Sequence, residues 1–192
     1  VAVGPVHAGV IEPGHFRFQC QVQTVHHLEI SLGYQHRGVE RAMAGGATPR
    51  ARHYMETLAG DTTVGHMTAY CRVMEALSDA RPPARAEALR AIAAELERIA
   101  NHLGDLGAMA GDVGFLPTMS YCGRIRGDAL NLTALLCGNR FGRGMVVVGG
   151  VGYDVDAALE DEILVRLDGI EKDAAGAIEL MFDTPSVLSR FE

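Results

Sequence analysis

The spacing of apolar residues changes along this chain from a period of two to a period of about 3.6 near residue 35. Before that point, apolar and polar residues alternate in two short runs, which contain Phe16, Phe18, Cys20 and Val22, and then Leu28, Ile30 and Leu32. Alternation is typical of a half-buried strand, and a break around residues 24–27 would let the two runs pair as an antiparallel hairpin. The sequence therefore predicts a small N-terminal β segment over residues 1–34.

From residue 35 onward the spacing is helical. The clearest helix follows Pro82 and Pro83, and its apolar residues recur at three- and four-residue steps: Leu89, Ile92, Leu96, Ile99, Leu103 and Leu106. We expect three more long helices: one that Asp61 or Thr62 caps, one over roughly 120–138, and one after Asp156. The predicted fold is mainly α (α+β overall), with residues 35–192 forming one compact helical bundle beside the β segment.

Each of these three helices carries a predicted apolar stripe. The stripes are Val64, Met67, Cys71, Met74 and Leu77; then Ile125, Ala129, Leu132 and Leu136; and then Leu159, Ile163, Leu167 and Ile170. The charged residues of the clearest helix are predicted to form a solvated face or surface pairs: Glu87, Arg90, Glu95, Glu97 and Arg98. Glycines between Gly138 and Gly152 predict a non-helical turn.

Composition excludes several classes of protein. The net charge of −7 gives no general attraction to nucleic acid or anionic lipid. The longest apolar stretch, Met145–Tyr153, carries three glycines and is far shorter than the roughly 20 residues that span a bilayer. The sequence has no initiating Met and no signal-like start, so we expect it to be a piece of a longer protein.

No familiar catalytic or metal motif is present in the sequence. The four cysteines, Cys20, Cys71, Cys122 and Cys137, form no C-x-x-C pair, so we expect reduced core cysteines and no bound nickel, iron or zinc. The absence of a G-x-S-x-G elbow, a phosphate loop and a dinucleotide fingerprint argues against a hydrolase, a nucleotidase or direct NAD binding.

One N-terminal group could carry proton chemistry. His7 and His15 flank Glu12 in a turn rich in glycine and proline. Burial would raise the pKa of the Glu12 carboxyl towards neutrality and let it pass protons, whereas the alternative is a solvated glutamate with no such role.

Several ordered strings resemble one known family. They are GPVHAGVIEPGHFRF (4–18), GYQHRGVE (33–40), ELERIANHL (95–103), and GNRF (138–141) followed by GGV (149–151). These strings resemble the large subunit of membrane-bound, formate-hydrogenlyase-type [NiFe] hydrogenases and the 49-kDa-type subunit of NADH:quinone oxidoreductase (complex I). The match runs from Gly4 to about Val151, and the sequence up to Phe191 is compatible with it.

The resemblance implies roles for particular positions. Members of the family bind nickel and iron through two C-x-x-C motifs; counting back from His66, the early pair falls on Ala59 and Thr62, and the late pair would lie beyond this sequence. These vacated positions imply no nickel ligand here. On the complex I side, the quinone-headgroup Tyr would align near Gly60, and a His would align with Gly142. Glu12 matches the proton-conducting Glu of hydrogenases and His7 matches the first His of the complex I opening motif, so both are candidate catalytic residues; no cofactor-binding residue is expected.

The resemblance also implies a function. It is that of an oxidoreductase subunit of a membrane-associated electron-transfer complex, cytoplasmic and peripheral on the inner face of the cell membrane, which couples redox chemistry to proton movement and is inactive as an isolated fragment. Its expected partners are an iron–sulfur small subunit, membrane-arm subunits and quinone, with NAD bound elsewhere in the complex. The alternative is a non-catalytic scaffold subunit that keeps the fold without the metal site. The residues leave open the electron donor, the electron acceptor and whether quinone binds.

Overall fold

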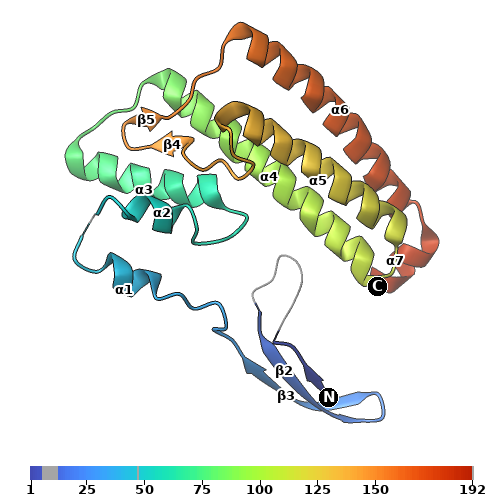
Figure 1. The fold of residues 1–192 in the computed structure, drawn as a ribbon. Coiled ribbons are helices and arrows are strands. Elements are labelled where there is room, and N and C mark those ends of the chain that lie inside the picture. The colour runs from blue at the N-terminus through green and yellow to red at the C-terminus, as the bar shows by residue number, and fades with distance from the viewer. Residues whose placement is uncertain (6–12, 47, 192) are drawn as a thin grey trace. The chain divides into compact units, whose positions relative to one another are not determined.

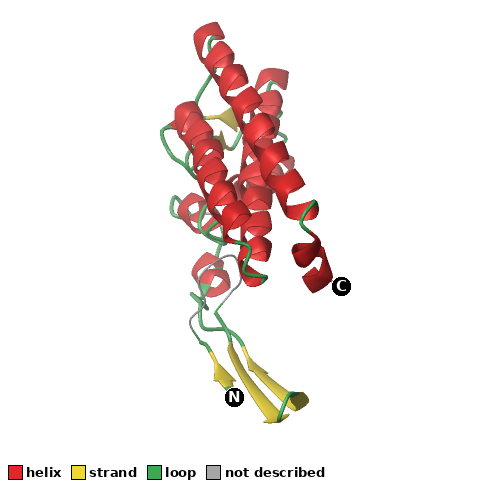
Figure 2. Cartoon of the chain, turned by 90° about the vertical axis from the view of Figure 1, so that its right-hand side faces the viewer, coloured by secondary structure: helices red, strands yellow, loops and turns green. Residues whose placement is uncertain are grey.

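The computed structural model describes residues 1–5, 13–46 and 48–191. They form two compact units, Val1–Thr48 and Pro49–Glu192. The first unit contains a small antiparallel sheet and the second is helical, so the predicted mainly α class is confirmed (Figures 1 and 2). The domain boundary between residues 34 and 35 stays a prediction.

The first unit is built on a three-stranded sheet. Its strands are β1 (Ala2–Val3), β2 (His15–Gln21) and β3 (Thr24–Ser31), in the order β1-β2-β3, and helix α1 (Val39–Met43) follows. All strand pairs are antiparallel, and Phe16 lies opposite Ile30 while Phe18 lies opposite Leu28. These cross-strand apolar pairs fix the register on one face of the sheet, and the predicted hairpin is confirmed.

The predicted break at residues 24–27 is wrong. The chain turns at Val22 and Gln23 instead, and residues 24–27 already belong to β3. Val22 has a φ of 56° and is 95% exposed. A β-branched residue rarely adopts a positive φ, so the turn lacks the glycine or asparagine that would have signalled it in the sequence.

The second unit holds the remaining elements. They are α2 (Ala51–Met55), α3 (Thr63–Ser78), α4 (Ala84–Asp112), α5 (Leu116–Cys137), β4 (Val146–Val147), β5 (Gly150–Val151), α6 (Ala157–Phe182) and α7 (Pro185–Phe191). Helix α5 packs against α4 and α6, and α3 contacts both α4 and the small β4–β5 hairpin (Figure 1). No helix among the described residues is long and apolar enough to cross a membrane.

The core side of α4 alternates large and small residues. Its buried apolar residues and glycine follow one another at steps of four and three: Leu89, Ala93, Leu96, Ala100, Leu103, Gly107 and Ala110. Ile92, predicted in this stripe, is 43% exposed. At Gly107 an added Cβ would lie 3.1 Å from the Cβ of Cys122, so the small residues let α5 approach closely. The sequence prediction favoured bulky residues and overlooked the alanines and the glycine.

The predicted apolar stripes on α5 and α6 face the core, whereas the stripe on α3 does so only in part. On α5 the four predicted residues are all buried, and on α6 Ile163 and Ile170 are buried while Leu159 and Leu167 pack against the same core. On α3 the stripe holds at Val64, Met67 and Cys71 but fails at Leu77, which is 78% exposed. Two residues before Leu77, the side chain of Glu75 points into the unit instead, because it pairs with the buried Arg90.

Candidate functional site

The N-terminus of α3 is capped by a side chain from another helix. The Glu97 carboxylate of α4 accepts hydrogen bonds from the backbone N–H of Val64 (Oε2, 2.6 Å) and of Gly65 (Oε1, 2.9 Å). Thr62 stands at the N-cap position, but its side chain makes no capping bond and its hydroxyl donates to Asp61 at 3.4 Å. The predicted side-chain cap from Asp61 or Thr62 is therefore wrong, since Glu97 satisfies the free N–H groups.

A second α4 residue holds the segment that precedes α3. Asn101, one turn after Glu97, donates from Nδ2 to the carbonyl oxygen of Asp61 at 3.0 Å. Residues four apart lie on the same side of a helix, so α4 presents both side chains to this segment. Thr63 is tied from another direction, because its hydroxyl donates to the carbonyl oxygen of Glu56 at 3.0 Å.

A small hollow opens beside these contacts. Its polar lining consists of Asp61, Glu97, Asn101, Arg126, Thr133 and Arg140, and its apolar lining of Ala100, Leu130 and Phe141. The cavity volume is about 10 Å³, which is room for about one water molecule. Among the described residues, neither Arg126 nor Arg140 forms an ion pair, so the hollow has two guanidinium groups without a fixed carboxylate partner.

Burial dominates the electrostatics of Glu97. Desolvation raises the pKa of this carboxyl above its ordinary value, and the backbone N–H groups of Val64, Gly65 and Thr63, with His66, lower it only in part. The charged form loses water when it is buried, and no arginine or lysine in the described part of the chain pairs with it to compensate. The site therefore contains a carboxylate whose ionisation is unfavourable compared with that of a solvated glutamate.

The glycine-rich segment after α5 is non-helical, as predicted, and the structure also packs its backbone against α3. Gly142 has a φ of +73°, and a Cβ at this position would lie 2.5 Å from Cγ2 of Val64. The backbone N–H of Gly144 donates to Oε1 of the buried Glu56 at 2.7 Å. Glycine at 142 is thus required both by the left-handed backbone and by the close approach of α3.

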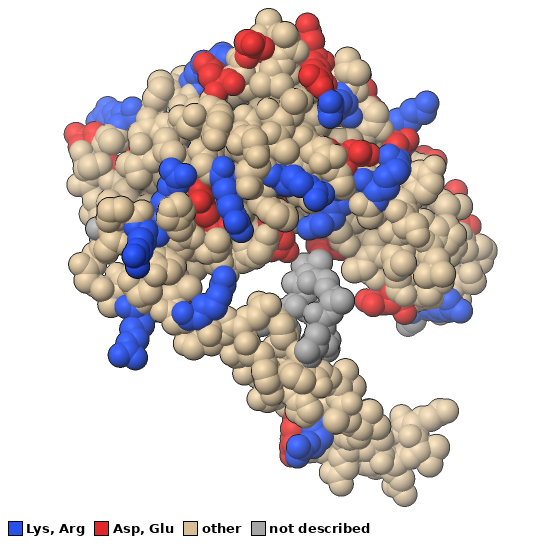
Figure 3. All heavy atoms as spheres, viewed as in Figure 1, with Lys and Arg blue, Asp and Glu red and all other residues tan. Residues whose placement is uncertain are grey.

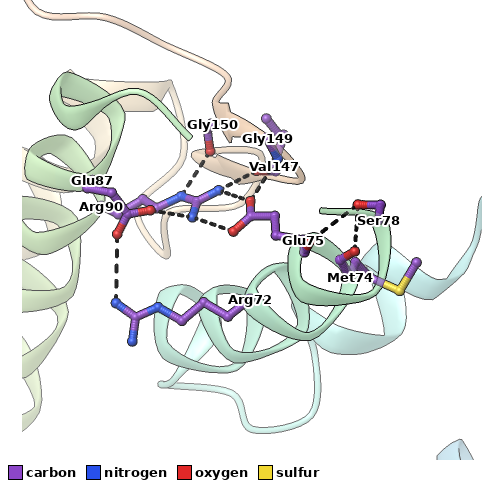
Figure 4. A network of polar contacts seen from close by, with 9 residues as sticks. All are labelled: Arg72, Met74, Glu75, Ser78, Glu87, Arg90, Val147, Gly149 and Gly150. Carbon is purple, nitrogen blue, oxygen red and sulfur yellow. Dashed lines mark hydrogen bonds and ion pairs between the residues drawn. The ribbon is translucent and has the colours of Figure 1, made fainter. Parts of the chain in front are cut away.

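A second polar cluster lies inside the unit, where α3, α4 and the β4–β5 hairpin meet (Figure 4). Arg90 pairs with Glu75 through two bonds of 2.6 and 3.2 Å, and also donates to the carbonyl oxygens of Val147 (2.7 Å) and Gly150 (3.0 Å). Glu75 accepts from the N–H of Gly149 at 2.7 Å. The hydrogen bond from Arg90 lowers the pKa of the Glu75 carboxyl.

This cluster corrects the prediction of a solvated charged face on α4, since Arg90 is only 2% exposed. The polar groups of this cluster are already paired with one another, so its role is structural. It holds the β4–β5 hairpin against α3 and α4. Glu97 is also withdrawn from that predicted face, whereas Glu95 and Arg98 form an exposed pair as expected.

The structure describes only some of the predicted site residues. Glu12 and His7 lie outside the described residues, so their roles stay predictions. Ala59 and Thr62 lie just before α3 and offer no thiolate. Within the described ranges, no group of three or more His, Cys, Asp or Glu residues is placed to hold a metal ion.

The cysteine prediction is correct for three residues. Cys71, Cys122 and Cys137 are buried and free, and burial raises the pKa of the Cys71 thiol to about 11. Cys20 is free but exposed on the sheet, so the prediction that it belongs to a core is wrong.

The sequence prediction missed Glu97 and Asn101 as site residues. Glu97 and Asn101 are four residues apart and lie on either side of the buried Ala100, which places both beside the apolar stripe. This spacing is their only signal in the sequence. What they bind lies 32 to 40 residues earlier in the chain, and helical spacing carries no information about such contacts.

Charged side chains of both signs cover the visible face of the helical unit (Figure 3). Lys and Arg side chains form a band across this face, with acidic side chains beside them. The face is mixed in sign and offers no broad basic surface of the kind that binds phosphate backbones.

Comparison with known proteins extends over the whole chain. Residues 112–192 match the family model of the 49-kDa subunit of respiratory-chain NADH dehydrogenase. Over 99% of its length, the chain is 28% identical to a carbon monoxide-induced hydrogenase of Rhodospirillum rubrum, 29% identical to hydrogenase-4 component G of Escherichia coli, and 31% identical to a subunit of the NADH-quinone oxidoreductase of Chlorobium phaeobacteroides. The chain is a homologue of these oxidoreductase subunits.

The resemblance predicted from the sequence strings is thereby confirmed. The aligned part covers 53% of the Rhodospirillum hydrogenase, 34% of the Escherichia coli component and 48% of the Chlorobium subunit. The chain thus spans about half the length, or less, of the curated relatives that it matches.

Proposed function

We propose that this chain is part of the large subunit of a membrane-associated electron-transfer complex, of the hydrogenase or NADH:quinone oxidoreductase type, that couples redox chemistry to proton movement. The observation that carries the proposal is the similarity, over 99% of the chain, to proteins named as subunits of both kinds of complex. The expected partners are an iron–sulfur small subunit and membrane-arm subunits, and the expected location is peripheral, on the cytoplasmic face of the membrane.

Nickel does not fit the positions that the resemblance assigns to its early ligands. A nickel–iron centre requires soft thiolates, and Ala59 and Thr62 have none. Cys71 and Cys137 are buried within the helical unit, and burial raises the pKa values of both thiols. We therefore derive no chemical step through nickel in this chain.

The hollow beside Glu97 does not fit a quinone. Its volume suits about one water molecule, whereas small-molecule sites usually have volumes of several hundred Å³. We propose that this chain contributes proton handling to the redox complex, with Glu12 and His7 as the candidates, on a scaffold that positions partner subunits.

The second candidate function is a non-catalytic scaffold, which the missing thiolates at Ala59 and Thr62 favour. Metal analysis of the intact complex, together with a quinone-reduction assay, separates the two. Quinone reduction without nickel supports the redox subunit, while an assembled complex with neither nickel nor quinone reduction supports the scaffold. Stoichiometric nickel held by this chain would contradict the scaffold and the expectation that Ala59 and Thr62 leave no nickel site.

Glu12 provides the sharper test of proton coupling. Replacement of Glu12 by glutamine removes the ionisable proton and keeps the shape of the side chain. We expect proton-coupled turnover of the whole complex to fall by about a hundredfold, as when a proton-transfer group is lost, with assembly nearly unchanged. Full turnover in the Glu12→Gln complex would remove Glu12 from the proton path.

A further inference from the structure

Glu97 links α4 to the first turn of α3. No other charged side chain among the described residues makes this link. The two carboxylate oxygens of Glu97 each accept one backbone N–H from the first turn of α3, at 2.6 and 2.9 Å. One turn along α4, Asn101 holds the carbonyl oxygen of Asp61. Together they attach the segment Asp61–Gly65 to α4 from both sides of the helix start.

We propose that Glu97 is a positioning residue, which acts as an anion to fix the segment Asp61–Gly65 at the edge of the hollow, with Asn101 as its neutral assistant. The proposal depends on the proposed redox function only where turnover is measured. Its structural part concerns this chain alone.

The geometry favours the ionised form of the carboxyl group, because each of its oxygens accepts one backbone N–H. A carboxylate is acceptor-only and can take both N–H groups at once, whereas a protonated carboxyl or an amide places a donor on one of the two positions. The positive end of the α3 dipole also favours an anion at this place. Protonation of Glu97 would therefore release at least one of the two N–H groups.

The surroundings of Glu97 contain few charges that could take over its role. The charged or titratable groups near it are Asp61 before α3, His66 on α3, and Arg126 and Arg140 on the other side of the hollow. Neither arginine bonds to its carboxylate in the described structure. The burial that raises the pKa of Glu97 makes its ionisation a cost to folding, so stability alone does not explain a glutamate at this position.

The test compares Glu97→Gln with Glu95→Gln in the intact complex. Glu95 lies two residues earlier on α4, is exposed and pairs only with Arg98 among the described residues, which makes it a matched control. Hydrogen exchange should become faster at the amides of Val64 and Gly65 in Glu97→Gln and stay unchanged in Glu95→Gln. In the quinone-reduction assay of the complex, kcat should fall about tenfold to a hundredfold with little change in KM, as when a reacting group is displaced slightly.

A pH profile separates positioning from simple loosening. In the wild-type complex, kcat should fall on the acid side as Glu97 takes up a proton, and this limb should be absent from Glu97→Gln. Asn101→Ala removes an uncharged contact to the same segment. It should lower kcat and keep the acid limb.

Each outcome decides the proposal. Unchanged exchange at Val64 and Gly65 in Glu97→Gln overturns it, whatever the activity, and so does faster exchange with an unaltered kcat and pH profile. A wild-type complex without redox turnover would instead defeat the proposed function. In that case the exchange comparison alone decides whether Glu97 holds the segment.

Discussion

Glu75, which is buried, and Glu97, which is half-buried, belong to the same helical unit, but their surroundings are opposite. Glu75 faces Arg90, and this hydrogen bond lowers the pKa of its carboxyl. Glu97 faces backbone N–H groups and a small hollow, and burial raises the pKa of its carboxyl. One carboxylate is neutralised by a partner of opposite charge, and the other is not.

The difference separates a structural role from a positioning role. A buried pair with all its hydrogen bonds satisfied fixes the elements around it, here α3, α4 and the β4–β5 hairpin, and loses much when one partner is removed. A carboxylate without a cationic partner contributes little net stability, because its desolvation opposes its hydrogen bonds. We therefore expect the Glu75–Arg90 pair to control folding and Glu97 to control local geometry.

The largest expected effect comes from Arg90→Met. This substitution leaves Glu75 buried without its partner and frees the carbonyl oxygens of Val147 and Gly150. The free energy of unfolding should fall by about 3–5 kcal/mol, as for other broken buried pairs. Denaturant unfolding of the purified chain measures this loss.

The control for this substitution is Arg98→Met on the same helix. Arg98 is 63% exposed at its side chain and pairs with the exposed Glu95, so about 0.5 kcal/mol or less should be lost. Equal losses in Arg90→Met and Arg98→Met would show that burial of the pair does not set its contribution.

A smaller effect is expected from Gly142→Ala, which tests how the turn fits against α3. The added Cβ meets a positive φ and a 2.5 Å approach to Val64, so about 2–4 kcal/mol should be lost from strain and overpacking together. Gly138→Ala has a similar φ of +72° and nothing within 4 Å, so only the backbone strain of about 1–2 kcal/mol remains. Thermal unfolding of both variants isolates the steric part, and similar losses would contradict the close contact.

The smallest effect is a pH dependence of opposite sign at the two glutamates. The lowered pKa of Glu75 gives stability that is present above the ordinary value of 4.5 and is lost as the pH falls through its folded-state pKa. The raised pKa of Glu97 gives stability that is present below 4.5 and is lost as the pH rises through its folded-state pKa.

Unfolding free energies measured from well below pH 4.5 up to pH 7 check these signs, because the Glu75 effect lies below 4.5 and the Glu97 effect lies above it. Relative to wild type, Glu97→Gln should gain stability as the pH rises, because glutamine does not titrate. Glu75→Gln should lose stability relative to wild type over the same range. Parallel curves for the two variants would show that their surroundings do not differ as described.

Local spacing in the sequence was enough to predict the four long helices and the N-terminal hairpin, but not the short helices α1, α2 and α7. The stripe on α5, from Ile125 to Leu136, is buried as predicted because one helix face meets one core. Spacing could not reveal that Ala93 and Ala100 replace Ile92 at the α4 core, since close packing selects small residues where a partner helix approaches. The turn at Val22 was missed because its residue type gives no turn signal.

The candidate site was less predictable than the fold. Glu97 and Arg90 were predicted to be ordinary surface charges on a helix, and what they bind depends on contacts between distant parts of the chain. The resemblance assigned the vacated nickel positions to Ala59 and Thr62, which lie in the chain on either side of Asp61, a residue that lines the hollow. It did not reveal that a carboxylate from α4 caps the helix that follows them.

The Glu75–Arg90 pair also has a consequence for the order in which the chain folds. Helices α4 and α5 are joined by a short connection and can pair early, whereas Arg90 must meet Gly150, 60 residues away, and Glu75 must meet Gly149, 74 residues away. Closing such long loops costs entropy, so we expect these bonds to form after the main folding barrier has been crossed. Bonds that are absent from the transition state slow unfolding without speeding folding. The bonds from Arg90 and Glu75 to the hairpin would then set how long the folded unit survives, and have little influence on how quickly it forms.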